Sequence, residues 1–192
     1  MRIISGDFKG KKIIDPKNIK TRPLKDLVKE SIFNIIHHSN KFKINLKNSN
    51  ILDLFSGIGS FGIECLSRGV NYVTFVENYK GVLPILKKNL SNLKKIQNYE
   101  IIEKNIYSKD FFLRTNKTFD LIFLDPPYKD KNFANILLSI HDNQNLNNNG
   151  VIIAHRHKNE NDILPENFKV IEEKIYGLSL IHISEPTRLS TI

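Results

Sequence analysis

Short apolar runs alternate with segments of helical periodicity along most of this chain. Apolar runs without polar alternation are typical of parallel strands that are buried on both faces. Strands that alternate with helices in this way indicate a doubly wound, Rossmann-like α/β fold with a parallel sheet. We expect a polar turn over residues 143–150, strands near residues 50–55, 71–76, 100–103, 119–124, 150–154 and 168–176, and helices near residues 60–68, 79–95 and 131–140.

The first strand of this series runs into a glycine-rich turn. Residues 51–55 form the apolar run, and residues 56–62 lead from it into an apolar helix start. Gly57 and Gly59 let the backbone approach a ligand closely, and the helix start offers unpaired N–H groups. Glu77 ends the next strand, where a carboxylate can bind the two hydroxyls of a ribose. Three glycines of the turn also fit the G-x-G-x-x-G pattern, so the turn alone leaves NAD and S-adenosylmethionine open.

The tetrapeptide Asp125-Pro126-Pro127-Tyr128 directly follows the apolar run 121–124. The carboxylate then stands where a buried strand ends, which is the edge that binds ligands in open α/β sheets. The two prolines stiffen the backbone, so its carbonyls are well placed to accept hydrogen bonds. A carboxylate, a rigid carbonyl and an aromatic ring match an exocyclic amino group on a flat nucleobase. A dehydrogenase has no obvious use for this group, so the combination favours S-adenosylmethionine and methyl transfer to an amine.

Four sequence blocks make the chain similar to the RsmD-type methyltransferases, which methylate guanine N2 in bacterial small-subunit ribosomal RNA. The similarity extends over residues 1 to about 177. The blocks are Met1-Arg2-Ile3-Ile4-Ser5-Gly6 through Gly10-Lys11-Lys12; Arg22-Pro23 with Asp26, Val28, Lys29, Glu30, Phe33 and Asn34; residues 53–64; and residues 119–128.

This resemblance implies a seven-stranded S-adenosylmethionine-dependent methyltransferase sheet and a guanine of 16S ribosomal RNA as the target. The residues implied at the target base are Asp125, Pro126, Pro127 and Tyr128. Those implied at the cofactor are Asp53, Phe55, Gly57, Gly59, Glu77, Asn105 and Ile106. The chain differs from the family pattern at Asn105, where an acidic residue is usual, and at Ala154-His155-Arg156-His157, where glutamates are usual.

Positive charge is concentrated in the first 50 residues, which hold 12 Lys or Arg against 4 Asp or Glu and so carry +8 of the total +9. We take residues 1–45 as a small basic N-terminal extension and residues 46–177 as the methyltransferase domain. Residues 2–14 are expected to form a hairpin or strand pair, and residues 24–38 a helix that exposes Lys25 and Lys29. The basic residues suit RNA phosphates, although a solvated basic face is the alternative. The candidate RNA contacts are Arg2, Lys9, Lys11, Lys12 and Arg22.

The remaining features are those of one cytoplasmic domain, and we expect a monomer that works without a metal. A single cysteine, Cys65, excludes an internal disulfide. No apolar run approaches the roughly 20 residues of a membrane span, and the N-terminus lacks a signal-peptide pattern. The pairs His37/His38 and His155/His157 have no convincing third metal ligand. The expected partner is ribosomal RNA within the small ribosomal subunit.

Composition changes at residue 178. All 23 lysines precede it, and residues 178–192 contain neither lysine nor asparagine. Residues 179–188 also resemble a peptide that arises when sequencing-adapter DNA is translated. We therefore interpret residues 178–192 as a non-native tail, which would truncate the last strand of the sheet after about Gly177. A genuine flexible tail is the alternative.

Three other functions remain open from the sequence. A DNA adenine or cytosine amino-methyltransferase would use the same tetrapeptide chemistry, and only the basic N-terminal blocks favour ribosomal RNA over DNA. An NAD-dependent oxidoreductase would fit the glycine turn and Glu77. A non-catalytic RNA-binding or ribosome-assembly factor would fit the differences at Asn105 and His155. Asp125 could also cap a Pro-Pro turn with no chemical role.

Overall fold

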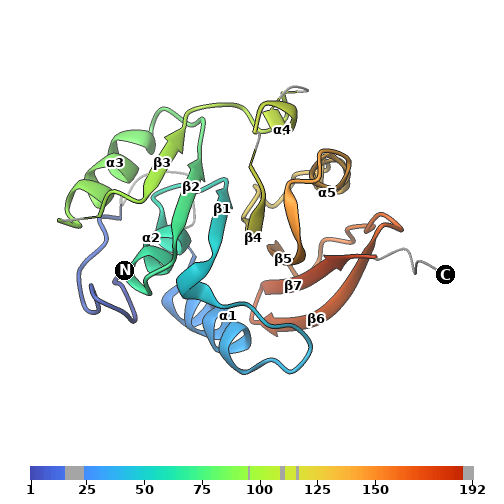
Figure 1. Ribbon diagram of the computed structural model, residues 1–192, viewed down its shortest axis with the longest axis horizontal. Helices are drawn as coiled ribbons and strands as arrows, with labels where there is room; N and C mark the ends of the chain where they lie inside the picture. Colours follow the sequence, from blue (N-terminus) through green and yellow to red (C-terminus); the bar gives the residue numbers. More distant parts are fainter. Residues whose placement is uncertain (16–23, 95, 109–110, 116, 188–192) are drawn as a thin grey trace.

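The computed structural model describes residues 1–15, 24–94, 96–108, 111–115 and 117–187. Helices and strands alternate through most of the chain, and two long strands close it (Figure 1). The elements are α1 (Asp26–His38), the 3-10 helix η1 (Leu46–Asn48), β1 (Asn50–Leu54), α2 (Ser60–Ser67), β2 (Tyr72–Val76), α3 (Leu83–Ser91), β3 (Tyr99–Ile102), α4 (Phe111–Arg114), β4 (Phe119–Leu124), α5 (Phe133–Asp142), β5 (Leu146–His157), β6 (Phe168–Tyr176) and β7 (Ser179–Pro186).

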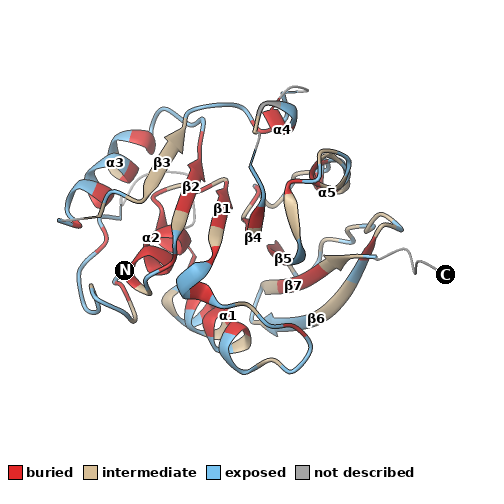
Figure 2. Ribbon diagram, viewed as in Figure 1, coloured by how far each residue is buried: buried red, intermediate tan, exposed pale blue. Residues whose placement is uncertain are grey.

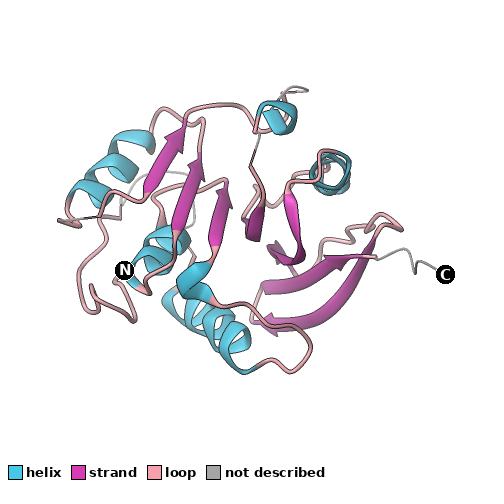
Figure 3. Ribbon diagram, in the orientation of Figure 1, coloured by secondary structure: helices cyan, strands magenta, loops and turns pink. Residues whose placement is uncertain are grey.

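The strands form one seven-stranded sheet in the order β3-β2-β1-β4-β5-β7-β6 (Figure 3). The strands from β3 to β5 in this order run parallel, while β7 pairs antiparallel with both β5 and β6. The chain builds outward from β1 to β3 and then returns to place β4 on the other side of β1. That reversal is a topological switch point, which is where open α/β sheets bind ligands. The predicted doubly wound, seven-stranded sheet is confirmed.

Helices cover both faces of the parallel part of the sheet (Figure 1). Phe33 of α1 and Phe61 of α2 belong to one hydrophobic cluster, together with residues of α3. Leu137 of α5 belongs to a second cluster on the opposite face, together with residues of α4. Because successive strand residues point to opposite faces, Ile51 joins the first cluster and Leu52 the second. Both are fully buried, which explains why β1 has apolar residues at consecutive positions (Figure 2).

Two local features differ from the sequence prediction. β5 begins at Leu146, within the stretch expected to be a polar turn, and it pairs with β4 through a register shift between Phe119 and Leu121. The irregular pairing accommodates polar residues that a regular buried strand would not hold. The four-residue helix α4 was not predicted, because so short a segment shows no helical periodicity.

The helix α1 buries a lysine that we expected on its exposed face. Lys29 is fully buried, and its Nζ lies 3.8 Å from Glu64 Oε2 and 3.6 Å from Asp26 Oδ1. It also donates a hydrogen bond to the carbonyl of Arg2. Burial lowers the pKa of the Lys29 ammonium, and the charges of Glu64 and Asp26 oppose that shift. The expectation for Lys29 was wrong because periodicity cannot reveal a buried partner on another helix, whereas Lys25 is exposed as predicted.

The first 15 residues pack along α2 and do not form a regular hairpin. A single antiparallel bridge joins Arg2 to Lys12. The carboxylate of Glu64 accepts hydrogen bonds from the backbone N–H groups of Ile4 and Ser5, so α2 supplies the partners that a second strand would have offered. Ile3 and Ile13 are buried in the same cluster as α1 and one face of the sheet. The basic extension therefore shares a hydrophobic core with the domain that follows.

The segment after Gly177 forms part of the sheet. Ser179–Pro186 is strand β7, which lies between β5 and β6. Ile181 and Ile183 of β7 are fully buried in the main cluster. The expectation that the sheet ends near Gly177 was therefore wrong, because a change in composition does not exclude an alternating pattern that pairs as a strand. The foreign origin of this segment stays a prediction.

Candidate active site at the carboxyl edge of the sheet

Three neighbouring strands end level with one another at the switch point. Leu54 of β1 pairs with Val76 of β2 on one side and with Leu124 of β4 on the other. The next residues of β2 and β4 are Glu77 and Asp125, so both carboxylates emerge at the same edge beside the turn that follows β1. The tertiary structure thus brings together the two acidic positions that the sequence placed on separate strands.

The turn after β1 leaves its backbone open to a ligand. Gly59 is the N-cap of α2 with φ of 85°, and a Cβ there would lie 2.5 Å from Leu86 Cδ1. Gly57 has φ of 56°, and a Cβ there would come no closer than 4.0 Å to another atom. Gly59 is therefore required by packing and conformation, while Gly57 borders open space beside the start of α2.

Glu77 connects the end of β2 to the glycine turn. Its Oε2 accepts a hydrogen bond of 2.8 Å from the N–H of Gly57. Its Oε1 accepts hydrogen bonds from the N–H groups of Asn78 and Tyr79, at 2.9 and 2.7 Å. Glu77 keeps only 8% of its surface exposed. The carboxylate is thus held in one orientation before any ligand arrives, a structural role that the sequence did not reveal.

Asp53 is a buried acid beneath this edge. It is 1% exposed, and its Oδ2 accepts a hydrogen bond of 2.9 Å from the N–H of Gly62. Burial raises the pKa of Asp53 to about 8; the Gly62 hydrogen bond opposes this rise, and the carboxylates of Asp125 and Glu77 add to it. A protonated Asp53 carries no charge, so the groups at this edge that favour a cationic ligand are the carboxylates of Glu77 and Asp125.

We expect Asp53→Asn to remove a pH dependence of stability. The folded-state pKa of about 8 lies above the unfolded value of about 3.9, so the folded chain binds the extra proton and stability falls as pH rises between these values. The slope for one such proton is at most about 1.4 kcal/mol per pH unit. The melting temperature of the variant should rise relative to that of the wild type as the pH increases from 5 to 8. A constant difference across this range would contradict the buried, protonated Asp53.

Asp125 has a side-chain partner at the end of β4. His155 of β5 lies with its Nδ1 2.8 Å from Asp125 Oδ1, and its Nε2 2.8 Å from the hydroxyl oxygen of Ser179. His155 follows Ala154, and Asp125 follows Leu124. Because Ala154 and Leu124 are paired in the sheet, His155 and Asp125 meet at its edge. In the sequence, His155 stands out only as a difference from the family pattern. Its position one residue after the strand expected over residues 150–154 was the signal that could have identified it.

Arg156 holds the loop that contains the tetrapeptide. It is fully buried, and its guanidinium binds both carboxylate oxygens of Asp162, at 2.5 and 2.8 Å. The same group donates to the carbonyl of Asp130 at 3.0 Å and, more weakly, to that of Pro127 at 3.4 Å. Pro126 is buried and Pro127 is exposed. The ring centroid of Tyr128 lies 5.4 Å from that of His157. The segment after β4 is therefore rigidly supported from β5.

The segment after β3 reaches across to the same loop. Tyr107 donates a hydrogen bond from its hydroxyl to Asp130, and its ring centroid lies 5.8 Å from that of Phe55. Phe55 adopts φ of 59°, which is unusual for a residue with a side chain. Asn105 is exposed and accepts a hydrogen bond from the N–H of Tyr107, while Ile106 is buried. Phe55, Asn105 and Ile106 thus border the edge at which we predicted the cofactor.

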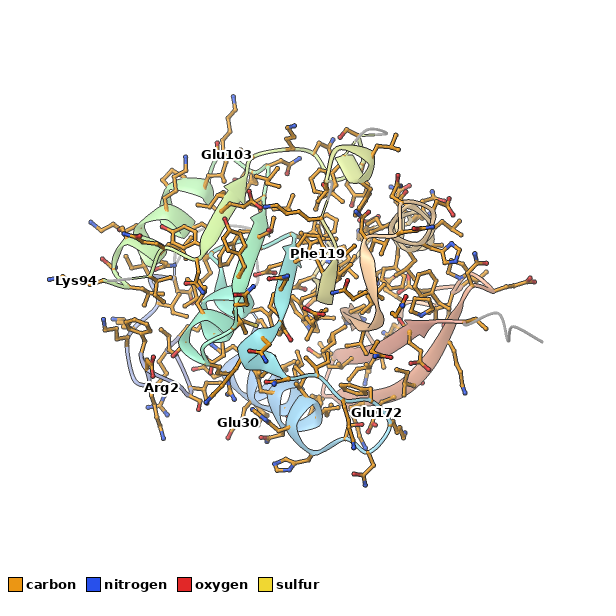
Figure 4. The ribbon with its side chains drawn as sticks, viewed as in Figure 1. Arg2, Glu30, Lys94, Glu103, Phe119 and Glu172 are labelled. Atoms are coloured by element: carbon orange, nitrogen blue, oxygen red, sulfur yellow. The ribbon has the colours of Figure 1, made fainter. Side chains whose placement is uncertain are left out.

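The predicted RNA contacts divide into two places along α2. The side chains of Arg2, Lys9, Lys11 and Lys12 are exposed, and Arg22 lies outside the described residues. The start of the chain reaches the start of α2, since Met1 Sδ lies 3.1 Å from Ser60 Oγ. Phe8 instead donates its N–H to Ser67 at the other end of α2, and Lys11 Nζ lies 4.7 Å from the Phe8 ring. Arg2 and Lys12 are therefore nearer the carboxyl edge than Lys9 and Lys11, and Figure 4 shows Arg2 at the periphery beside the N-terminal loop.

The described ranges contain neither a metal-ligand cluster nor a membrane-spanning helix. No group of three or more His, Cys, Asp or Glu side chains there is arranged to hold a metal ion. Within the same ranges, every helix is too short or too polar to cross a bilayer. His37 Nε2 lies 3.3 Å from Arg68 Nη1, and His157 Nδ1 accepts a hydrogen bond from the N–H of Asn159.

Comparison with known proteins assigns the chain to a family. A model of the family described as Conserved hypothetical protein 95 matches residues 1–185. Ribosomal RNA small subunit methyltransferase D of Haemophilus influenzae is 35% identical over 181 residues, which span 93% of this chain and 90% of that protein. The chain belongs to the RsmD-type family. The RsmD-type resemblance predicted from the four sequence blocks is confirmed, and the match extends into β7.

A further relative and a solved structure agree with the fold. Ribosomal RNA small subunit methyltransferase D of Buchnera aphidicola from Acyrthosiphon pisum is 33% identical, over 90% of this chain and 86% of that protein. The structure of yhhF of Escherichia coli, assigned as a methyltransferase, superposes with a TM-score of 0.81 at 25% identity, covering 98% of this chain and 99% of that one. The α/β methyltransferase fold of this chain is therefore shared along its whole length.

Proposed function

We propose that this protein methylates the exocyclic N2 amino group of a guanine in small-subunit (16S) ribosomal RNA, with S-adenosylmethionine as the methyl donor. The observation that carries the proposal is the position of Asp125, at the end of β4 and beside the glycine turn of β1. The names of the Haemophilus and Buchnera relatives support ribosomal RNA as the substrate. We place the protein in the cytoplasm with its RNA.

The residues at the edge fit S-adenosylmethionine. The open backbone at Gly57 would lie against the cofactor, and Glu77 would accept hydrogen bonds from its ribose hydroxyls. The carboxylates of Glu77 and Asp125 at this edge favour a positively charged ligand. Phe55, Asn105 and Ile106 would border the adenine, with the amide of Asn105 in place of a carboxylate. When bound, the cofactor supplies a methyl group on a positively charged sulfur, and that sulfur keeps the bonding electron pair.

The protein prepares the amine for this reaction through Asp125 and the backbone. The lone pair of a guanine amine is delocalised into the ring, so the amine is a poor nucleophile. Hydrogen bonds from the amine to Asp125 and to the carbonyl of Pro126 would draw that pair back onto nitrogen. Asp125 would take the proton that the amine loses and pass it to solvent, since 22% of its side chain is exposed. Tyr128 would stack on a base turned out of its helix or lying in a loop.

Glu77→Ala should weaken S-adenosylmethionine binding by about 1.5 to 3 kcal/mol, because a charged acceptor for the ribose hydroxyls is removed. The change also releases the N–H of Gly57, which loosens the glycine turn. Titration calorimetry measures the affinity, and Glu77→Gln, which keeps one acceptor oxygen, should lose less. Unchanged affinity in a folded Glu77→Ala variant would remove Glu77 from the cofactor site.

Neutralising Lys9, Lys11 and Lys12 together should weaken RNA binding and flatten its salt dependence. The slope of log affinity against log salt should fall by about 0.7 to 0.9 for each phosphate that the variant no longer neutralises. Cofactor affinity should not change. Replacing Lys158, Lys169 and Lys174 in the same way removes equal charge from the β5–β6 side and serves as the control. Equal effects from both sets would indicate general attraction and no phosphate binding by the N-terminal lysines.

The decisive experiment is a methyl-transfer assay with labelled S-adenosylmethionine. Naked small-subunit RNA, assembled small subunits and duplex DNA are offered separately, and the methylated nucleoside is then identified. N2-methylguanine from RNA is the expected product. Methylated adenine or cytosine from DNA would favour the DNA amino-methyltransferase. Cofactor binding without transfer to any substrate would favour a non-catalytic factor, and binding of NAD in place of S-adenosylmethionine would favour an oxidoreductase.

A further inference from the structure

The contact between His155 and Asp125 has a direct consequence for the proposed reaction. His155 is buried, with 5% of its side chain exposed, and lies between an acidic group and a hydroxyl. Asp125 Oδ1 is 2.8 Å from Nδ1, and Ser179 Oγ is 2.8 Å from Nε2. Asp125 Oδ2 makes no hydrogen bond to any residue that the structure describes. One oxygen of the carboxylate is therefore committed to the imidazole, which leaves Oδ2 as the oxygen available to a substrate.

We propose that His155 is a positioning residue, which donates Nδ1–H to Asp125 Oδ1 and thereby presents Oδ2 to the target amine. This inference rests on the proposed function, because it gives Asp125 the task of accepting from that amine. An ionised Asp125 only accepts hydrogen bonds, so the nitrogen facing it must carry a proton. The Ser179 hydroxyl can donate or accept, so with the proton on Nδ1 it donates to the unprotonated Nε2. The imidazole fixes the rotation of the carboxylate, which a side chain of two rotatable bonds would otherwise leave free.

The arrangement also gives the Asp125 carboxylate, of which 22% is exposed, a hydrogen-bond partner within the protein. This hydrogen bond replaces one that water would otherwise make. The His155 ring also makes a T-shaped contact with Tyr128, at 6.3 Å between centroids, but Tyr128 keeps its closer contact with His157 when His155 is removed. Removing His155 should therefore slow the chemical step through Asp125 and leave the binding of RNA and cofactor intact.

The test compares His155→Ala with His155→Asn under single-turnover conditions, at saturating RNA and cofactor. The amide N–H of asparagine can replace Nδ1–H, whereas alanine offers no donor. We expect the rate to fall about 10- to 100-fold in His155→Ala, as when a hydrogen bond to a charged group is removed, and to recover most of that loss in His155→Asn. The KM for RNA and the Kd for cofactor should be unchanged in both. His38→Asn, an exposed histidine of α1, should behave as wild type.

A second measurement does not depend on activity. Long-range nitrogen–proton NMR correlations should show His155 as the Nδ1–H tautomer in the wild type. They should show the same tautomer in a folded Ser179→Ala variant, because the Asp125 carboxylate alone requires a proton on Nδ1. The Nε2–H tautomer in the wild type would overturn the inference, and so would a full rate in a folded His155→Ala variant or equal loss in the alanine and asparagine variants. If methyl transfer is absent from the wild type, the proposed function fails first. If transfer depends on Asp125 but not on His155, only this inference fails.

Discussion

Asp125→Ala should lower single-turnover methyl transfer by about 10²- to 10³-fold, or roughly 2.7 to 4 kcal/mol of barrier. The variant lacks the carboxylate that accepts from the target amine as the new bond forms. The glycine turn and Glu77 remain tied to each other through Gly57, so cofactor affinity should change little. Saturating RNA isolates the chemical step from binding, and calorimetry checks that the cofactor still binds.

A further variant separates the chemistry of Asp125 from its place in the loop. Asp125→Asn keeps the shape of the side chain and an oxygen that can accept from His155, but it loses the charge, so its rate should fall between the parent and alanine values. The loop itself is held by Arg156 through Asp162, independently of the Asp125 carboxylate. If folded Asp125→Ala transfers methyl groups at the parent rate, Asp125 only caps the turn and the proposed site is wrong.

Ending the chain at Gly177 should abolish cooperative folding, or lower the melting temperature far below that of the whole protein. β7 lies between β5 and β6, so its removal leaves β6 without a paired strand and opens one edge of β5. Ile181 and Ile183 are fully buried. Truncating a buried isoleucine to alanine costs about 2 to 5 kcal/mol, and a whole domain is stable by only about 5 to 15 kcal/mol.

Point variants in the same region provide the matched comparison. Ile183→Ala should destabilise the protein by the amount expected of a core residue, whereas Leu178→Ala should have little effect, because Leu178 is 53% exposed. Denaturant unfolding followed by circular dichroism measures both. A chain that ends at Gly177 and melts like the whole protein would show that residues 178–192 are dispensable to the fold, as their composition led us to expect.

The class of fold, the family and most of the candidate site could be predicted from the sequence alone. Buried parallel strands are contiguous apolar runs, so β1 and β4 were visible without any knowledge of their neighbours. A glycine turn and an Asp-Pro-Pro-Tyr segment are likewise local, because their backbone requirements are met within a few residues. Since ligands bind where parallel strands end, the sequence analysis placed Glu77 and Asp125 each at such an end, while the strand order that sets them on either side of β1 came from the structure.

The side chains that support that edge became apparent only in three dimensions. His155 beside Asp125, Arg156 beside Asp162 and the buried Lys29 beside Glu64 are all polar contacts between residues that lie apart in the sequence. Local periodicity predicts whether a side chain is buried, but not which partner compensates its charge once it is buried. The same limit explains β7, whose composition differs from the rest of the chain. Residues 179–186 form a strand because they pair with β5 and β6, and this pairing depends on residues far away along the chain.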